Sequence, residues 1–198
     1  MTLKLALTGS IGMGKSTVAA MFVEAGIALF DADAEVRRLQ SNGGALVAAI
    51  AARFPGTVVN GSVDRDLLGA RVLGDRDELA ALEVIVHPAV QSAREAFVAA
   101  HRDVPALLFD IPLLFETGGE AAFDKVIVVS ARSEVQRDRV LARPGMTRAK
   151  FDAIITRQMP DEAKRARADF VIDTDGSLDQ TRAEVERIVA CLELPTGR

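Results

Sequence analysis

The sequence has no tryptophan and no tyrosine, so its nine phenylalanines supply all of its aromatic side chains. Proteins that bind single-stranded nucleic acid usually stack the bases on aromatic rings along a basic groove. The formal net charge of this chain is -4, whereas binding to a phosphate backbone needs a basic surface. These shortages argue against a nucleic-acid-binding protein. A local group of arginines would still allow an acidic small molecule to bind.

Cysteine and long apolar runs are also scarce. The single cysteine, Cys191, excludes an internal disulfide, and its place among apolar residues at helical spacing predicts a buried, inert thiol. No apolar run approaches the roughly 20 residues that span a bilayer, and the N-terminal run leads straight into a glycine loop rather than a leader cleavage site. We therefore expect a cytoplasmic protein with no membrane partner.

Length and composition are those of an ordinary globular chain. With 198 residues, 49% hydrophobic and 26% charged, the chain can form one well-buried domain, with or without a small appended lobe.

The clearest motif lies at the N-terminus, where the apolar run Leu3–Thr8 leads into Gly9–Thr17. The second stretch fits the pattern G-x-x-x-x-G-K-[ST] without a mismatch. A strand that turns tightly into a helix directs the unpaired N–H groups of the first helical turn at an anion such as a nucleotide phosphate. An ordinary Gly-rich turn is the alternative, but the amphipathic segment Val18–Glu24, with Gly26 as its C-cap, favours a phosphate site.

Each residue type in this motif has its own task. Lys15 would reach the β- and γ-phosphates, Ser16 would ligate Mg²⁺ through its hydroxyl, and Thr17 would lie near the α-phosphate. ATP and Mg²⁺ are therefore the expected cofactors. The expected cofactor-binding residues are Gly12, Met13, Gly14, Lys15, Ser16 and Thr17.

Two aspartates follow the second expected strand, Ile27–Phe30. Ligands bind at the carboxyl edge of open α/β sheets, and Asp31 and Asp33 end this strand two residues apart. Either carboxylate could accept a proton from an attacking hydroxyl or hold Mg²⁺ through water. Alternatively, Asp33 is only the N-cap of a helix over residues 34–39.

Residues 43–104 show helical spacing, interrupted by turn sequences such as Asn60-Gly61-Ser62. This insertion is longer than a strand crossover requires, so we expect a substrate-binding lobe rather than a separate domain. His87 lies within it beside Pro88, and a histidine in that setting is more often structural than catalytic.

A third strand, Ala106–Phe109, is apolar throughout and ends in Asp110. An acidic residue in this place corresponds to a Walker B aspartate, which holds Mg²⁺ directly or through water. The apolar residues that follow either line a pocket or pack against the helical lobe. Strands are also expected at Lys125–Val129 and Phe170–Ile172, with helices over 133–141 and 178–192, which together predict a parallel α/β sheet.

The one basic concentration lies between the last two strands, where ten basic residues face five acidic ones between Arg132 and Arg167. Arg139 and Arg143 are one helical turn apart and would share a face. With the Arg143-Pro144-Gly145-Met146 segment as a hinge, they would clamp the transferred phosphoryl group under a closing lid. A solvated basic face is the alternative.

Five further segments accompany the Walker A loop: Asp31-Ala32-Asp33; Leu82-Glu83-x-Ile85-x-His87-Pro88; Asp110-Ile111-Pro112-Leu113-Leu114-Phe115-Glu116; Gln158-Met159-Pro160 with Lys164; and Ala168-Asp169-Phe170-Val171-Ile172-Asp173. In this combination the sequence resembles the dephospho-CoA kinase family over nearly its whole length. Two positions depart from the pattern: Thr174 stands where members commonly have Asn, and Ile154 where many have Arg. The second departure leaves open which nearby arginine meets phosphate.

The resemblance implies a P-loop kinase of the nucleotide-kinase type, with a three-layer α/β/α fold around a five-stranded parallel sheet. It implies a single domain over residues 1–198, with a core of 1–33, 105–136 and 169–198, a helical CoA-binding lobe over about 34–104 and a lid over about 137–168. It also implies a monomer or weak homo-oligomer that takes ATP and dephospho-CoA as substrates.

The implied reaction is transfer of the γ-phosphate of ATP to the ribose 3′-hydroxyl of dephospho-CoA. The expected catalytic residues are Asp33 as general base, Lys15, Arg139 and Arg143, and the expected metal ligands are Ser16 and Asp110. The expected substrate-binding residues are Asp31, Asp33, His87, Asp110, Pro112, Leu113, Leu114, Phe115 and Gln158.

Three rival functions remain at this stage. Another small-molecule P-loop kinase would act on a nucleoside monophosphate or a sugar acid, and only the acceptor lobe separates it from the first hypothesis. A GTP-binding switch would need an N-K-x-D motif, but the two asparagines, Asn42 and Asn60, are each followed by glycine. A structural nucleotide-binding module would not need the lid arginines.

Overall fold

The computed structural model describes residues 2–194 and divides into two compact units, Met1–Phe30 with His101–Arg198, and Asp31–Ala100. Each unit contains its own cluster of buried apolar side chains.

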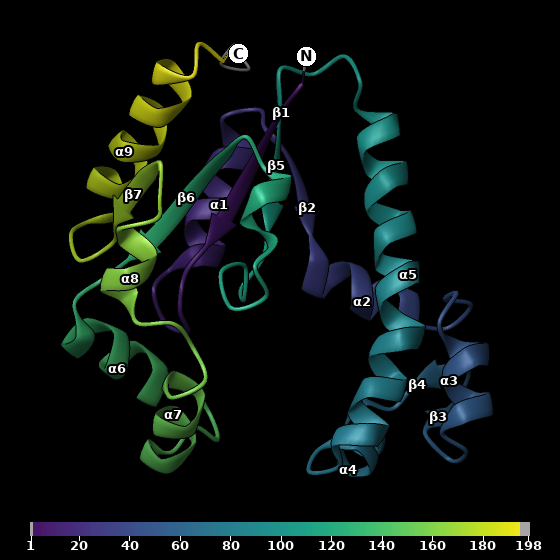
Figure 1. Ribbon diagram of the computed structural model, residues 1–198. Coiled ribbons are helices and arrows are strands. Elements are labelled where there is room, and N and C mark those ends of the chain that lie inside the picture. The colour runs from purple at the N-terminus through teal and green to yellow at the C-terminus, as the bar shows by residue number, and fades with distance from the viewer. Residues whose placement is uncertain (1, 195–198) are drawn as a thin grey trace. The chain divides into compact units, whose positions relative to one another are not determined.

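A five-stranded parallel sheet forms the centre of the first unit (Figure 1). Its strands follow the order β2-β5-β1-β6-β7, and the pairings of β1 with β5, β1 with β6 and β6 with β7 are parallel. The predicted fold class is therefore confirmed. The bounds of the strands are β1 Leu3–Thr8, β2 Ala28–Asp31, β5 Ala106–Asp110, β6 Lys125–Ser130 and β7 Phe170–Asp173.

Both faces of the sheet are buried, which explains why the strands are apolar along most of their length, with polar residues mainly at their ends. Leu5 and Leu7 of β1 point into one core cluster, whereas Ala6 between them belongs to another. Strand β6 alternates in the same way, with Ile127 in the first cluster and Val128 in the second.

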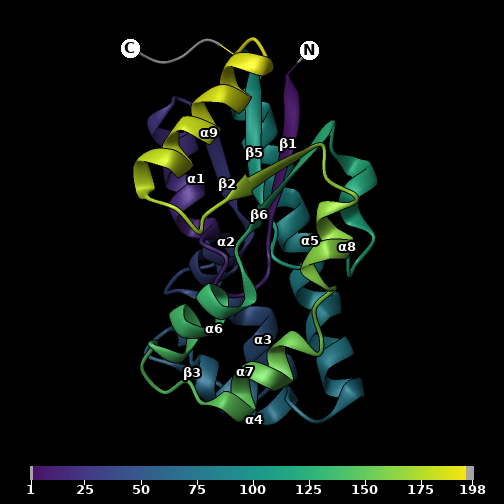
Figure 2. The same ribbon diagram turned by 90° about the vertical axis from the view of Figure 1, so that its left-hand side faces the viewer.

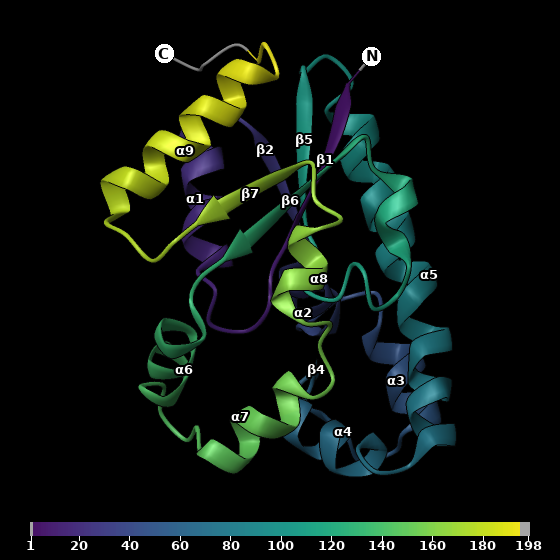
Figure 3. The same cartoon turned by 60° about the vertical axis from the view of Figure 1, so that its left-hand side comes forward.

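Helices cover the two faces in separate layers. Helices α1 (Lys15–Glu24) and α9 (Leu178–Cys191) pack together on one side, and α8 (Asp161–Arg165) contacts β6 on the other (Figure 3). A short 3₁₀ helix, η1 (Gly119–Ala122), precedes β6. The prediction for Cys191 is wrong because its side chain is exposed at the end of α9.

Two further helices of this unit, α6 (Ser133–Leu141) and α7 (Arg148–Ile155), lie beyond the carboxyl ends of the strands (Figure 2). The bounds of α6 agree with the predicted helix over 133–141. The chain turns between the two helices at Gly145, whose φ of 72° lies in the left-handed region. The basic segment predicted as a lid is therefore built from these two helices and the chain up to α8.

The second unit is mainly helical, as the sequence predicts for residues 43–104. Its helices are α2 (Ala32–Gln40), α3 (Val47–Arg53), α4 (Arg65–Val72) and α5 (Arg76–Ala100), and α5 packs against the other three. At Asn60-Gly61 the sequence predicted only a turn between helices. In the structure this turn connects the two strands of a β-hairpin, β3 (Val58–Val59) and β4 (Ser62–Val63). Both turn residues have positive φ, 50° and 78°, as a two-residue type I′ turn requires.

His87 and Pro88 lie in the interior of α5, and the histidine side chain is exposed. Within residues 2–194, no helix combines the length and apolar character that a membrane crossing needs.

Candidate active site

The polar ends of four parallel strands meet at one edge of the sheet. Leu7 in β1 pairs with Asp110 at the end of β5, Thr8 pairs with Val128, and Ser130 at the end of β6 pairs with Asp173. The glycine loop leaves β1 at this same edge. The carboxyl edge is where open α/β sheets bind their ligands, so the topology places the candidate site here.

The loop opens helix α1 directly, because the helix begins at Lys15 with Gly14 as its N-cap. Gly14 has a φ of 91°, and a Cβ there would lie 3.2 Å from Thr174 Oγ1. Gly12 has a φ of 81° and approaches α6 so closely that a Cβ would collide with Val140. These two positions require glycine. The N–H groups of the first turn therefore belong to the motif residues, as anion binding requires.

The side chains of Lys15 and Asp110 contact each other across the mouth of the loop. Asp110 is 6% exposed, so its carboxylate is buried against this lysine. The contact joins the lysine expected to bind phosphate to the expected Walker B residue, although the two residues lie far apart in the sequence.

The expected magnesium ligands supply the kind of donors that the ion prefers. Ser16 is exposed in the first turn of α1, and both its hydroxyl and the Asp110 carboxylate are oxygen donors. Mg²⁺ commonly keeps several waters and takes only one or two protein ligands beside substrate phosphates. The described residues hold no cluster of three or more His, Cys, Asp or Glu side chains suited to a metal.

Two glutamine side chains, Gln136 of α6 and Gln158 of the lid segment, hold the backbone of Ile11 in the loop. The N–H of Ile11 donates to Gln158 Oε1 at 3.1 Å, and the carbonyl of Ile11 accepts from Gln136 Nε2 at 2.8 Å. Gln158 thus contacts the phosphate loop itself. Its predicted contact with substrate stays a prediction.

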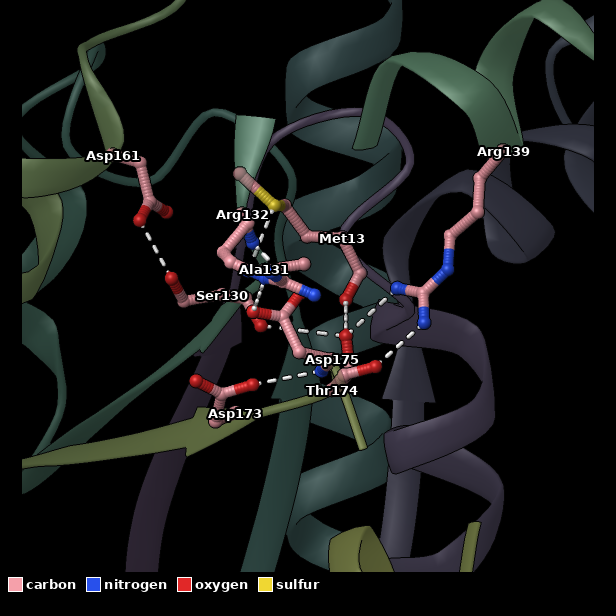
Figure 4. Close-up of polar contacts among 9 residues, drawn as sticks. All are labelled: Met13, Ser130, Ala131, Arg132, Arg139, Asp161, Asp173, Thr174 and Asp175. Atoms are coloured by element: carbon pink, nitrogen blue, oxygen red, sulfur yellow. Dashed lines mark hydrogen bonds and ion pairs between the residues drawn. The ribbon is translucent and has the colours of Figure 1, made fainter. Parts of the chain in front are cut away.

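Met13 contributes through its backbone and its core packing. Its side chain is 1% exposed, and its sulfur accepts a hydrogen bond from the Ala131 N–H at 3.1 Å (Figure 4). The carbonyl of Met13 accepts from the hydroxyl of Thr174 at 2.8 Å.

A cavity of about 330 Å³ adjoins the loop. It is lined by residues of the glycine loop, of α1, of α6 and the turn after it, of the segment after β7, and of the start of α9: Gly12, Gly14, Thr17, Arg139, Arg143, Thr174, Gly176, Leu178 and Thr181. The cavity therefore brings together the expected phosphate loop and both expected lid arginines. Arg143 is exposed, whereas Arg139 is held by Thr174 (Figure 4).

Asp31 and Asp33 lie in the other unit, at the start of α2. Asp31 is the N-cap of this helix, and its Oδ1 accepts from the Ala34 N–H at 2.8 Å. The capping role considered for Asp33 therefore belongs to Asp31. Asp33 lies in the first turn of α2 with an exposed side chain. Its role as general base stays a prediction.

The apolar residues after β5 divide between core and surface. Leu113 is 44% exposed, whereas Leu114 and Phe115 are 0% and 4% exposed and belong to a core cluster. The guanidinium of Arg167 lies 4.7 Å from the centre of the Phe115 ring. Pro112 is partly buried. Of the four residues predicted to contact substrate here, the two buried ones have little side-chain surface to offer.

Glu116, which ends this apolar segment, forms a largely buried ion pair. Lys164 Nζ lies 2.9 Å from Glu116 Oε1, and the lysine side chain is fully buried. Burial alone would raise the pKa of Glu116, but the contact with Lys164 and the hydrogen bond from the Met159 N–H outweigh it, so the pKa lies below its usual value. The pair fixes the segment beside Gln158 to the loop after β5.

The sequence alone did not identify four of the residues around the cavity: Thr174, Gly176, Leu178 and Thr181. Thr174 was noted only as a departure from a family pattern. One available signal was its place directly after β7, at the carboxyl edge of the sheet. Gln136 carried no signal, because its contact with Ile11 depends on how α6 approaches the loop.

Comparisons with known proteins identify the relatives of this chain. The family model described as dephospho-CoA kinase matches residues 3–180. A dephospho-CoA kinase of Mesorhizobium japonicum is 56% identical over 187 residues, which cover 93% of this chain and 94% of that protein.

Solved structures show the same fold. The TT1252 protein of Thermus thermophilus has a TM-score of 0.84 and 36% identity, over 96% of this chain and 98% of that one. The dephospho-CoA kinase of Campylobacter jejuni has a TM-score of 0.68 at 22% identity, over 96% of this chain and 97% of that one, and supports the fold alone.

Proposed function

The chain belongs to the dephospho-CoA kinase family and phosphorylates dephospho-CoA to coenzyme A, and we propose how its residues divide this task. In the proposed reaction, ATP donates its γ-phosphoryl group to the ribose 3′-hydroxyl of dephospho-CoA. The 3′ oxygen forms a bond to phosphorus, the bond to the β-phosphate oxygen breaks, and ADP leaves.

The glycine loop binds the phosphates of ATP. Its N–H groups at the start of α1 supply fixed donors, and Lys15 adds a positive charge at the β- and γ-phosphates. The carboxylate of Asp110 contacts this lysine and helps to position it. We assign the rest of the nucleotide to the cavity that Thr17 and the glycine loop line.

Ser16 and Asp110 would hold Mg²⁺. Both are oxygen donors at the carboxyl edge of the sheet, one at the start of α1 and one at the end of β5. The ion supplies charge neutralisation for the phosphates.

The lid arginines stabilise the phosphoryl group during its transfer. Charge on a transferred phosphoryl group spreads over its equatorial oxygens, and a guanidinium offers several donors in one plane. Arg139 and Arg143 line the same cavity as the glycine loop, so either is placed to stabilise this charge. Exclusion of water under the lid would prevent ATP from being hydrolysed instead.

The unit Asp31–Ala100 serves the acceptor. Asp33 accepts the proton of the 3′-hydroxyl and orients it for attack in line with the leaving ADP. We assign dephospho-CoA to the helical lobe that contains Asp33 and His87.

The observation that carries this proposal is the joining of Lys15 to Asp110 beside a cavity that both lid arginines line. A Gly-rich turn without a nucleotide function would not need a buried carboxylate against its lysine. A purely structural nucleotide module would not need the arginines.

The test is ADP release from Mg²⁺-ATP in the presence of dephospho-CoA, AMP, CMP or gluconate as acceptor. We expect strong stimulation by dephospho-CoA alone, and loss of turnover when Mg²⁺ is chelated. Turnover with another acceptor but none with dephospho-CoA would preserve the kinase and overturn the substrate. Nucleotide hydrolysis that no acceptor stimulates would overturn both.

A further inference from the structure

Thr174 sits where the end of β7 meets the glycine loop, and it is 6% exposed. Its hydroxyl donates to the Met13 carbonyl at 2.8 Å, and a Cβ placed on Gly14 would lie within 3.4 Å of three of its side-chain atoms. The threonine therefore packs directly against the backbone of the loop that binds phosphate.

The same residue holds Arg139 through two oxygens (Figure 4). Arg139 Nη1 donates to Thr174 Oγ1 at 2.9 Å, and Nη2 donates to the Thr174 carbonyl at 2.5 Å. A guanidinium is planar, so two bonds from different nitrogens fix its orientation as well as its position.

The hydrogen-bonding capacity of a hydroxyl explains why threonine suits this place. A hydroxyl has one proton to donate and two lone pairs to accept with. The proton goes to the Met13 carbonyl, since the distance to the Ser130 carbonyl is 3.3 Å and that to Met13 is 2.8 Å. A lone pair is left for Arg139. One oxygen atom thus ties the lid arginine to the glycine loop.

Thr174 is itself held firmly. Its N–H donates to the Ser130 carbonyl at 2.9 Å. The next residue, Asp175, accepts from the backbone N–H and the Nε of Arg132 at 2.8 and 2.9 Å (Figure 4). The segment after β7 is therefore fixed to the segment after β6, and it offers Arg139 a rigid support.

We propose that Thr174 is a positioning residue that acts through Arg139. It orients the guanidinium over the cavity beside the glycine loop. Both acceptors on Thr174 are uncharged, so the contact leaves the positive charge of Arg139 available to a phosphate. This role rests on the proposed function, in which Arg139 stabilises the transferred phosphoryl group.

The first experiment compares Thr174→Val with Thr174→Ser. Valine keeps the branched shape against Gly14 but removes both hydroxyl contacts, and serine keeps the hydroxyl. We expect kcat/KM for ATP, at saturating dephospho-CoA, to fall about 10- to 100-fold in Thr174→Val. Thr174→Ser should stay within about threefold of wild type. An unchanged Thr174→Val, or a serine variant as impaired as valine, would overturn the proposal.

The second experiment asks whether the effect passes through Arg139. Arg139→Lys keeps a positive charge but cannot make the two-point contact. In the Arg139→Lys background we expect Thr174→Val to lower kcat/KM for ATP by less than about threefold, because the two-point contact between residues 139 and 174 is already lost. A full additional loss would show that Thr174 acts through the loop or through stability, which contradicts the proposal.

A matched control separates positioning from folding. Thr57 is 4% exposed and donates to the Phe54 carbonyl at 2.7 Å, so Thr57→Val also removes a buried hydroxyl, in the other unit. We expect both valine variants to lower the melting temperature and only Thr174→Val to lower kcat/KM. Equal kinetic losses in the two would contradict the proposal. Inactive wild type would refute the proposed function instead, a result distinct from any of these.

Discussion

Asp31 and Asp33 lie two residues apart, but their carboxylates have different surroundings. The carboxylate of Asp31 is committed to the N-terminus of α2, where it accepts from the Ala34 N–H. Asp33 lies two residues further along the chain, in the first turn of α2, and its side chain is exposed. No hydrogen bond to its carboxylate is found within the described chain. A general base needs a carboxylate that is free to take a proton, and Asp33 meets this requirement better than Asp31.

Asp33→Asn should therefore reduce kcat about 10²- to 10⁴-fold, because the amide cannot accept the proton of the acceptor hydroxyl. ADP affinity, measured by calorimetry, should be unchanged. Glu35→Gln is the matched control, because it removes one negative charge from the same first turn. Near-wild-type turnover by Asp33→Asn would mean that another group takes the proton.

Some residues of the candidate site could be predicted from the sequence, and others could not. Lys15, Asp110 and Arg139 were proposed as site residues from a motif, a strand end and a local excess of charge, all of which are visible along the chain. Thr174 was visible only as an unexplained departure, because its significance depends on Met13 and Arg139, which lie far from it in sequence. Long-range contacts of this kind leave no local pattern.

At the scale of elements, the second half of the lid is attached to the sheet by a buried charge pair. Glu116, after β5, forms an ion pair with Lys164 of α8 and accepts a hydrogen bond from the Met159 N–H. Gln158, which precedes Met159 in the chain, accepts a hydrogen bond from the Ile11 N–H of the glycine loop. A fully buried ammonium is tolerated only when a partner compensates its charge. The pair therefore determines where the chain segment next to the glycine loop lies.

Glu116→Gln should destabilise the protein by about 3–5 kcal/mol near neutral pH, because it leaves Lys164 buried without a counter-charge. The pKa of Glu116 is lowered in the folded state, so its contribution is present above the unfolded pKa and is lost as pH falls through the folded value. The difference in melting temperature between wild type and variant should therefore shrink as pH is lowered below about 4.3.

Urea and thermal unfolding across this pH range would measure the effect. Glu162→Gln, an exposed position in α8, provides the control for loss of one carboxylate. A stability difference that stays constant down to pH values where carboxylates protonate would refute an ionic origin.

Elements were predictable wherever burial or spacing was regular. The five strands were predicted because burial on both faces makes them largely apolar, and α6 was predicted from its helical spacing. The β3–β4 hairpin was missed because each of its strands has two residues, too few for a period to appear. Its Asn60-Gly61 turn was recognised as a turn, yet it carries the signature of a hairpin.

At the scale of the whole molecule, the chain divides into two compact units, and the residues proposed to bind the two substrates are distributed over them. The residues expected to bind nucleotide belong to Met1–Phe30 and His101–Arg198, and those expected to serve the acceptor are found in both units, with Asp33 and His87 in Asp31–Ala100. The boundaries predicted for core and lobe, 33/34 and 104/105, lie close to these divisions, although the substrate of each part remains a proposal.

Hydrogen exchange can locate the two substrates separately. Mg²⁺-ADP should slow exchange in residues 9–17, because a bound phosphate accepts hydrogen bonds from these N–H groups. Dephospho-CoA should slow exchange within residues 31–100. In Lys15→Ala the first protection should weaken and the second persist, since the role proposed for this lysine is to bind the phosphates of the nucleotide. Protection by dephospho-CoA that never reaches residues 31–100 would place the acceptor on the sheet unit and refute the assignment of the helical lobe.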